Sequence, residues 1–421
     1  DTTTTVFTLA TDISQVSDTS NSYFLQEIEN GQFEVYFGDG VIGKALTDNN
    51  IVILEYIVTN KSASNGASTF TPPGSISGSS DNSVATVSTA SGGAEAENIQ
   101  SIKLNAPLDY ASQGRAVTTN DFKVIVPTLF ANTQSVSVWG GEDNDPASYG
   151  KVFISVKTTT GSDLTSTQKR NLESSLKSYV VSSIRPEVVD PEVISIRLTT
   201  TFKYNSTATT KTNNDLAALV STTIADYNTN NLGLFSAPFR YSELIGQIDD
   251  SDTSINSNIT TVQMSKTFTP TLNSSSSYTI AFNNAFFNPH SGHSTIIAST
   301  GFFIDGASTE YFFDDDGQGN LRIYSLVAGV RTYFNSQAGT VDYANGIIKI
   351  NSILITSVSN VDGSASTQFR LTVLPSSNDV IPVRDQILQI DVANSSVTVE
   401  TDSFASGTSD GGTTYTTTSS Y

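Results

Sequence analysis

One short acidic run has the spacing of a calcium-binding loop. In Asp314-Asp-Asp-Gly-Gln-Gly-Asn320, oxygen ligands would come from Asp314, Asp316 and Gln318. The twelfth position of such a loop needs a bidentate Glu, but Ser325 stands there, and no flanking helix is expected. We therefore expect a polar turn between two strands, with a cation site as the alternative reading.

A second acidic cluster follows the only tryptophan, Trp139. Glu142, Asp143 and Asp145 could supply the acid and the nucleophile or base of glycoside hydrolysis. The preceding glycine pair and the proline after the cluster favour a solvated acidic loop instead. We expect that loop.

The only two histidines, His290 and His293, are three residues apart and could bind a metal ion. The proline and glycine beside them predict a loop, and no third ligand is near in the sequence. A Ser-His-Asp triad would have to use one of these two, and no Gly-x-Ser-x-Gly elbow is present. We expect ordinary loop histidines, no catalytic or metal-binding residue, no cofactor and no enzymatic activity.

Composition narrows the class of protein. A length of 421 residues predicts two to four domains, and the net charge of −20 argues against nucleic acid or an anionic membrane as a partner. The absence of cysteine excludes disulfides and thiolate metal sites and is compatible with folding in a reducing cytoplasm. No apolar run approaches the ~20 residues that span a bilayer. The chain opens at Asp1 and its only methionine is Met264, so we expect the true N-terminus to be missing.

The most specific pattern is a strand, a turn rich in glycine and a second strand. Apolar residues occupy every second position of Phe33–Phe37, which predicts a half-buried strand. The apolar run Ile51–Val58 is the expected second strand. The turn contains glycines that need positive φ or a close approach of the backbone, and one acid. These turn residues are Gly38, Asp39, Gly40 and Gly43.

Three capping boxes predict helices in the middle of the chain. A side-chain oxygen at the N-cap is followed three residues later by an acid or amide at Thr118–Asp121, Thr165–Gln168 and Thr212–Asp215. Expected strands lie at 135–138, 151–157 and 193–204, with a short helix at 242–248. We expect a strand near 84–87 and a crossing segment at 105–110, which contains a proline.

No helical period is visible after residue 265. Strands are expected near 279–282, 295–298, 321–326, 347–355, 369–373 and 387–392. The fold class is therefore α+β with several domains. The expected domains are a β-rich module at 1–117, an α/β region at 118–265 that divides near 192–205, and a C-terminal β-domain at 266–421 with an extended polar tail.

The turn Phe37-Gly-Asp-Gly-Val-Ile-Gly43 resembles that of the baseplate J-like family of contractile phage tails. The resemblance continues in the family's order over roughly 200 residues. It includes Asp121-Phe122, Val138-Trp139-Gly140-Gly141-Glu142, Gly150–Ile154 and Arg185-Pro186. The motifs Tyr311–Gly317, Val341–Gly346 and Thr413–Tyr421 are most similar to the wedge subunits of T-even-type phages.

This resemblance implies a structural subunit of a baseplate wedge in the virion, synthesised and assembled in the host cytoplasm. A homodimer, other wedge proteins and neighbouring wedges of a six-fold baseplate would form a ring around the hub. The ring would switch its packing to relay the contraction signal. The residues that we take from it as interface or structural candidates are Gly38, Asp39, Gly40, Gly43, Asp121, Phe122, Trp139, Gly140, Gly141 and Tyr421.

Two other functions remain open at this point. A composition rich in Thr and Asn is also typical of secreted or tail-borne proteins that bind or cleave glycans, although a single tryptophan offers few sugar platforms. A wedge subunit of a related contractile injection system would show the same turn and α/β features.

Overall fold

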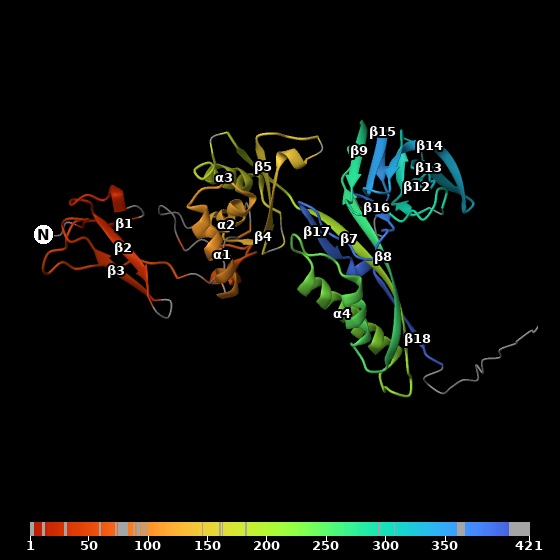
Figure 1. Cartoon of the computed structure of the whole chain (residues 1–421), viewed down its shortest axis with the longest axis horizontal. Helices are drawn as coiled ribbons and strands as arrows, with labels where there is room; N and C mark the ends of the chain where they lie inside the picture. The colour runs from red at the N-terminus through yellow and green to blue at the C-terminus, as the bar shows by residue number, and fades with distance from the viewer. Residues whose placement is uncertain are drawn as a thin grey trace, which may run out of the picture. The chain divides into compact units, whose positions relative to one another are not determined.

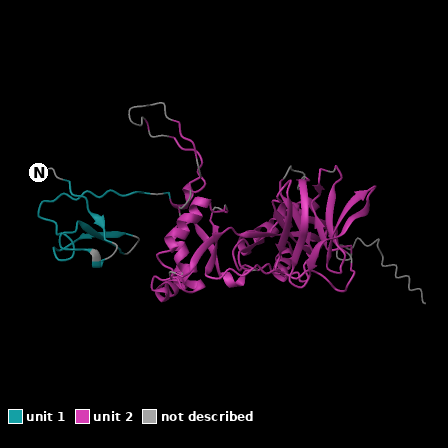
Figure 2. Cartoon of the chain, turned by 90° about the horizontal axis from the view of Figure 1, so that it is seen from above, with its two compact units in different colours: residues 1–60 teal, residues 61–421 magenta. Residues whose placement is uncertain are grey.

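The computed structural model describes residues 4–403 with short internal gaps. The gaps are 11–12, 29–31, 59, 72–73, 75–82, 87–88, 91–92, 94, 96, 98, 145, 160, 162, 182, 294, 307 and 360–366. The chain forms two compact units, residues 1–60 and residues 61–421 (Figure 2). Its architecture is α+β, as expected from the sequence, and no described helix is both long and apolar enough to cross a membrane.

The first unit is a small three-stranded sheet. Strand β2 (Ser22–Glu27) lies in the middle, parallel to β1 (Thr8–Leu9) and antiparallel to β3 (Phe33–Phe37), and a 3₁₀ turn, η1 (Ile13–Gln15), follows β1. The strand expected at Ile51–Val58 is not formed, because no neighbouring described strand pairs with it. A strand requires a hydrogen-bonded partner, which local sequence cannot supply.

The segment between this unit and the first central helix also differs from expectation. The 3₁₀ turn η3 (Lys61–Ser64) is followed by irregular backbone, and the described residues 83–86 form no strand. The crossing segment expected at 105–110 is wrong, because these residues lie inside helix α1 (Ile99–Ser112). Pro107 suggested a break, and the exposed helix has no apolar stripe that would have revealed its period.

After α1, the second unit continues with an α/β layer. Its elements are α2 (Thr119–Leu129), β4 (Thr133–Gly140), η4 (Gly141–Asp143), β5 (Lys151–Thr158), α3 (Ser166–Leu176) and β6 (Arg185–Val189). β5 is antiparallel to β4 and parallel to β6, and α3 makes the crossover between β5 and β6. Val126, Ile154 and Leu176 are fully buried in the core that this sheet shares with the two helices.

A long twisted sheet follows, with its own core. Its elements are β7 (Glu192–Tyr204), α4 (Asn213–Asn231), α5 (Tyr241–Asp249), β8 (Ile255–Phe268), β10 (Ile297–Ser299), β16 (Phe369–Val373), β17 (Gln386–Ile390), η5 (Val392–Asn394) and β18 (Ser396–Thr401). The strand order is β10–β16–β8–β7–β17, and β18 also pairs with β7. α4 lies alongside the antiparallel strands β7 and β8 (Figure 1). The alternate residues Ile194 and Ile196 of β7 share a core with Leu216 and Val220 of α4.

A barrel-like sheet is inserted between β8 and β16. It contains β9 (Ser275–Ala281), β11 (Phe302–Ile304), β12 (Tyr311–Asp315), β13 (Asn320–Val327), β14 (Val330–Asp342) and β15 (Ile347–Val358). The order is β11–β12–β13–β14–β15–β9, and a further pairing of β11 with β15 closes the ring. The long sheet thus combines residues on both sides of position 266, and the three expected domains stay a prediction.

Short sequence patterns correctly predicted several helices and strands of this unit. All three capping boxes form, at Thr118, Thr165 and Thr212, and the expected helix at 242–248 is α5. Each of the six strands expected after residue 265 overlaps an observed strand, β9, β10, β13, β15, β16 or β17. The strands β11, β12, β14 and β18 were missed.

Candidate functional site

The family-like turn after β3 is a closed loop held by its own polar groups. Oδ1 of Asp39 accepts hydrogen bonds from the backbone N–H of Val41 (2.8 Å) and Ile42 (3.0 Å). These hydrogen bonds lower the pKa of the Asp39 carboxyl, and the bond from Ile42 has the larger effect. The Asp39 side chain is therefore ionised at neutral pH. The loop presents Val41 and Ile42 to solvent, with exposed fractions of 74% and 43%.

The glycines of this loop are required by its geometry. A Cβ on Gly38 would lie 2.2 Å from the backbone carbonyl of Gly43, so no side chain fits. Gly40 and Gly43 have φ of +87° and +84°, which side-chain-bearing residues rarely adopt. The Gly43 N–H donates to the Ser17 carbonyl (3.1 Å), which ties the loop to the segment before β2. The motif is therefore a rigid, exposed, partly apolar loop.

Asp121 and Phe122 together fix the start of α2. Oδ2 of Asp121 accepts from the backbone N–H of Thr118 (2.7 Å) and Val117 (3.0 Å). Burial alone would raise the pKa of Asp121, but these two hydrogen bonds outweigh it and lower the pKa. Phe122 is 1% exposed and packs in the core of the α/β layer. Both residues thus stabilise the layer itself.

Trp139 and the glycine pair shape the loop after β4. The indole Nε1 donates to Oδ1 of Asn144 (2.8 Å), and the ring stacks on Phe153 at 5.8 Å. A Cβ on Gly141 would lie 1.9 Å from the Ser148 carbonyl oxygen, whereas a Cβ on Gly140 would meet the carboxylate of Glu142. The glycines therefore permit a tight loop that covers the tryptophan.

The described acidic residues of that loop lie at the surface. Glu142 and Asp143 lie on η4 and are exposed, whereas Asp145 lies outside the described residues. Both described side chains are open to solvent, as in the solvated acidic loop that the sequence favours.

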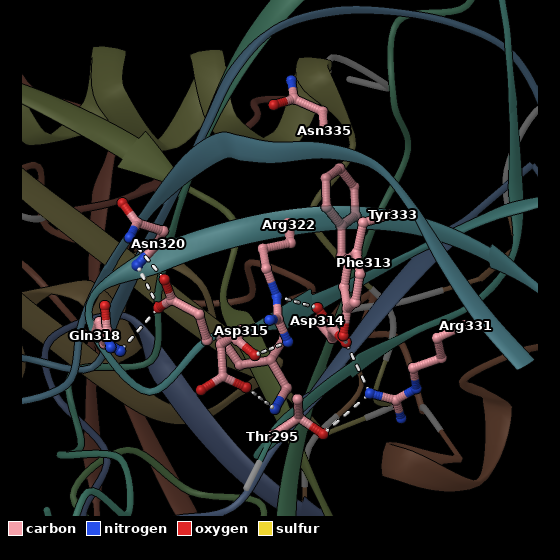
Figure 3. Close-up of polar contacts among 12 residues, drawn as sticks. Thr295, Phe313, Asp314, Asp315, Gln318, Asn320, Arg322, Arg331, Tyr333 and Asn335 are labelled. Atoms are coloured by element: carbon pink, nitrogen blue, oxygen red, sulfur yellow. Dashed lines mark hydrogen bonds and ion pairs between the residues drawn. The ribbon is translucent and has the colours of Figure 1, made fainter. Parts of the chain in front are cut away.

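A buried polar cluster lies on the barrel, around Asp314 (Figure 3). The side chain of Asp314 is 1% exposed and sits between two cations: Arg322 Nε donates to Oδ1 (2.9 Å) and Arg331 Nη1 to Oδ2 (2.7 Å). The hydroxyl of Tyr333 also donates to Oδ2 (3.1 Å). Arg322 lies 4.3 Å from the centroid of the Tyr333 ring, and Arg331 lies 4.7 Å from that of Tyr324.

The next two carboxylates are also engaged by protein donors. Asp315 accepts from the backbone N–H of Ile296 and Ile297 at one oxygen and from the Tyr343 hydroxyl (2.7 Å) at the other. Burial, then the bond to Asp315, raises the pKa of Tyr343, which stays a donor. Asp316 caps the β12–β13 turn by accepting from backbone and side chain of Asn320 and from the N–H of Gln318.

These contacts define the cluster as internal cross-links between strands. Asp314 joins β12 to β13 and β14, and Asp315 joins β12 to the start of β10. Among the described residues no group of three or more His, Asp and Glu side chains has the geometry to hold a metal ion. Asp316 thus caps the polar turn that the sequence predicts between two strands.

The two histidines occupy different environments. His290 is exposed, whereas His293 is buried with its ring edge-on to Tyr343 at 5.7 Å. Nδ1 of His293 lies 3.3 Å from the His290 carbonyl oxygen, and Nε2 lies 3.8 Å from Oδ2 of Asp315. His293 is therefore part of the packing beneath the cluster. The last candidate, Tyr421, lies outside the described residues.

Sequence reasoning missed the exposed apolar surfaces. Residues 330–337 of β14 are all exposed, including Val330 (67%) and Phe334 (62%). Ile51–Val58 is exposed along nearly its full length. The apolar content of both segments was visible, but only the structure shows that neither is covered by the described chain.

Comparisons with known proteins agree with the division into two cores. Residues 118–189 match the family model "Baseplate structural protein gp6, C-terminal domain I", and residues 192–267 match "Baseplate structural protein gp6, C-terminal domain III". The first range spans α2 to β6, and the second spans β7 to β8.

A curated relative covers more of the chain. It is the baseplate wedge protein gp6 of Enterobacteria phage T4, 26% identical over an alignment of 269 residues that covers 58% of this chain and 40% of that protein. The chain thus spans less than half the length of this relative. A solved structure of the anti-feeding prophage baseplate matches at 17% identity over 42% of each chain, with a TM-score of 0.29, and that likeness is too weak to support an argument.

Proposed function

We propose, from this similarity to baseplate wedge proteins of the phage tail, that the chain is a structural subunit of a contractile tail baseplate. It would reside in the virion tail and act through contacts with other subunits and not through catalysis. One observation carries the proposal: models for domains I and III of one baseplate protein match adjacent ranges of this chain, 118–189 and 192–267.

The finer features of the proposal come from the resemblance to the baseplate J-like family. Two copies would associate, bind other wedge proteins, and meet neighbouring wedges in a six-fold ring around the hub. Rotation at these interfaces would then relay the contraction signal. The rigid loop at Gly38–Gly43 and the exposed surface of β14 are the surfaces that we assign to subunit contacts.

The distribution of side chains supports a role in assembly. The barrel carboxylates Asp314 and Asp315 are engaged by protein donors, so their chemistry is used for stability. Apolar side chains instead lie at the surface, at Val41 in the loop and at Val330 and Phe334 on β14. Exposed apolar patches of this kind mark protein–protein contacts.

Light scattering of the purified chain over a range of concentrations tests the proposal. The chain is measured alone and with wedge proteins encoded by the same virus. We expect self-association and capture of a wedge protein. A chain that stays monomeric and binds none of them would contradict the proposal.

A pair of variants tests the assignment of β14. Phe334→Asp removes an exposed aromatic ring and should weaken capture of the wedge partner. Thr398→Asp adds the same charge at an exposed polar position on β18 and should leave capture unchanged. Equal capture by both variants would remove β14 from the proposed interface.

A further inference from the structure

The first compact unit has no hydrophobic core of its own. None of the described apolar side chains in residues 4–60 is buried, although the sheet has aromatic residues on β2 and β3. Among the described residues, the first buried apolar side chain is that of Ala116. Units of this size depend on burial of most of their apolar surface to offset conformational entropy. Further apolar surface must therefore cover this sheet.

The same unit contains an apolar segment without a partner. Seven of the eight residues in Ile51–Val58 are large and apolar, with exposed fractions of 47% to 89%. Residues 51–58 make no hydrogen bond to any other described residue. β-branched and aromatic residues favour β-strands, and a strand with unpaired backbone groups can pair with the free edge of a sheet.

An open edge of matching character lies in the same unit. β3 pairs only with β2, so its other edge is unpaired among the described strands. Phe33, Val35 and Phe37 lie on one face of β3, and Phe33 is 59% exposed. Addition of a strand to this edge would satisfy its backbone groups and cover these side chains.

We infer that residues 51–58 of one copy add to the free β3 edge of a second copy, reciprocally, so that strand exchange completes both sheets. This rests on the self-association in the proposed function and names the segments that make it. Reciprocal exchange closes on itself about a two-fold axis, and it uses surfaces that each copy already carries.

The area and charge of the two segments fit a stable dimer. Burying one large apolar side chain removes roughly 60–120 Å² of apolar surface. Seven such side chains from each copy supply on the order of 1,000 Å², near the lower limit of specific interfaces. Although the chain carries −20, residues 51–58 contain one acid, Glu55, and β3 contains one, Glu34. The pairing elements are thus nearly free of the repulsion between two acidic chains.

Disulfide scanning tests the inference, and the absence of native cysteine makes each introduced thiol unique. Full chains with Val35→Cys are mixed with longer, tagged full chains that carry one cysteine at each position from 51 to 58. The mixed product is identified by its intermediate mass. We expect the yield of the mixed disulfide to be highest for one cysteine position between 51 and 58. Cysteines two residues from that position should give more product than cysteines next to it, because alternate side chains of a strand share a face. Ile259→Cys, exposed on β8, is the control and should give no product.

A second pair of variants measures the contribution to affinity. Ile53→Asp, at a position 84% exposed in the single chain, should weaken dimerisation at least about tenfold while the fold is retained. Ile259→Asp on β8, 74% exposed, changes the same residue type and should leave the dimer unaffected. High salt should not dissociate the dimer, because its contacts are apolar.

The outcomes separate this inference from the proposed function. Alternating cross-links and a weakened Ile53→Asp dimer support strand exchange. A wild-type dimer without that pattern, or one to which Ile53→Asp is indifferent, overturns strand exchange and leaves self-association standing. A wild-type chain that is monomeric at all concentrations overturns self-association as well.

Discussion

The carboxyl of Asp385 should destabilise the long sheet at neutral pH. Asp385 lies directly before β17, and its carbonyl oxygen accepts from the N–H of Glu192 (2.8 Å) at the start of β7. Burial, reinforced by the nearby Glu192 carboxylate, raises the pKa of Asp385 from 3.8 to about 6. The folded pKa therefore exceeds the unfolded one, so the ionised form is penalised in the native state.

The size and sign of the effect follow from that gap. A difference of about 2 units corresponds to at most about 3 kcal/mol, and partial exposure reduces this to about 1–2 kcal/mol. The penalty is fully present above about pH 6 and disappears as pH falls toward 4. Asp385→Asn should therefore raise the free energy of opening at pH 7–8 by about 1–2 kcal/mol and match the wild type near pH 4.

Hydrogen exchange of the β7 and β17 amides measures this free energy locally, after correction for the intrinsic exchange rate at each pH. Asp252→Asn is a control of opposite sign. The Lys211 ammonium, then Ser254, lowers the pKa of Asp252 to about 2, so its stabilisation is present above pH 3.8 and is lost below it. That variant should lose about 1–2 kcal/mol at pH 7. If the free energies of opening of the wild type and of Asp385→Asn differ by the same amount at every pH from 4 to 8, the reasoning is refuted.

Three further changes have defined outcomes. Gly38→Ala would place a Cβ 2.2 Å from the Gly43 carbonyl and should speed amide hydrogen exchange in residues 38–45 at least about tenfold. Gly246→Ala in α5 has open space around its Cβ and should not change exchange. Equal effects of the two variants would refute the steric argument. Thr165→Ala removes the N-cap of α3 and should lower the free energy of unfolding by about 1 kcal/mol, measured by denaturation with the fluorescence of the single tryptophan as the signal. Thr165→Ser keeps a capping hydroxyl and should be near neutral. An equal loss of stability in both variants would contradict a capping role. Arg322→Met should destabilise the barrel by about 3 kcal/mol, as measured by hydrogen exchange in β12 and β13. Arg331→Met should cost about 1 kcal/mol, because the arginine side chain is 43% exposed. The reverse order would show that Arg331 is the main partner of Asp314.

Features set by a few adjacent residues were predictable from the sequence. A capping box needs only four positions, so Thr118, Thr165 and Thr212 marked the starts of α2, α3 and α4 correctly. The turn glycines were also recognisable, although the clash that requires Gly38 depends on the path of residues 38–43. The alternation of Val193–Tyr204 was sufficient to identify β7.

Features that depend on distant residues were not predictable. β16, β17 and β18 join β7 and β8 after an inserted barrel, and no local period encodes such a return. Asp314 was visible as an acid in a turn, but Arg331 reaches it from a separate strand. The strand expected at Ile51–Val58 has the right composition and lacks a partner in the single chain. α1 was missed because it presents no apolar stripe to a core.

Labelling of the assembled particle tests the central claim most directly. Antibodies raised against the purified chain, with gold conjugates, are applied to intact particles with contractile tails from the source of the chain and viewed by electron microscopy. A structural baseplate subunit predicts gold at the distal end of the tail, and the chain in the protein content of washed particles. Washed particles that lack the chain, or label confined to another part of the virion, would contradict the account.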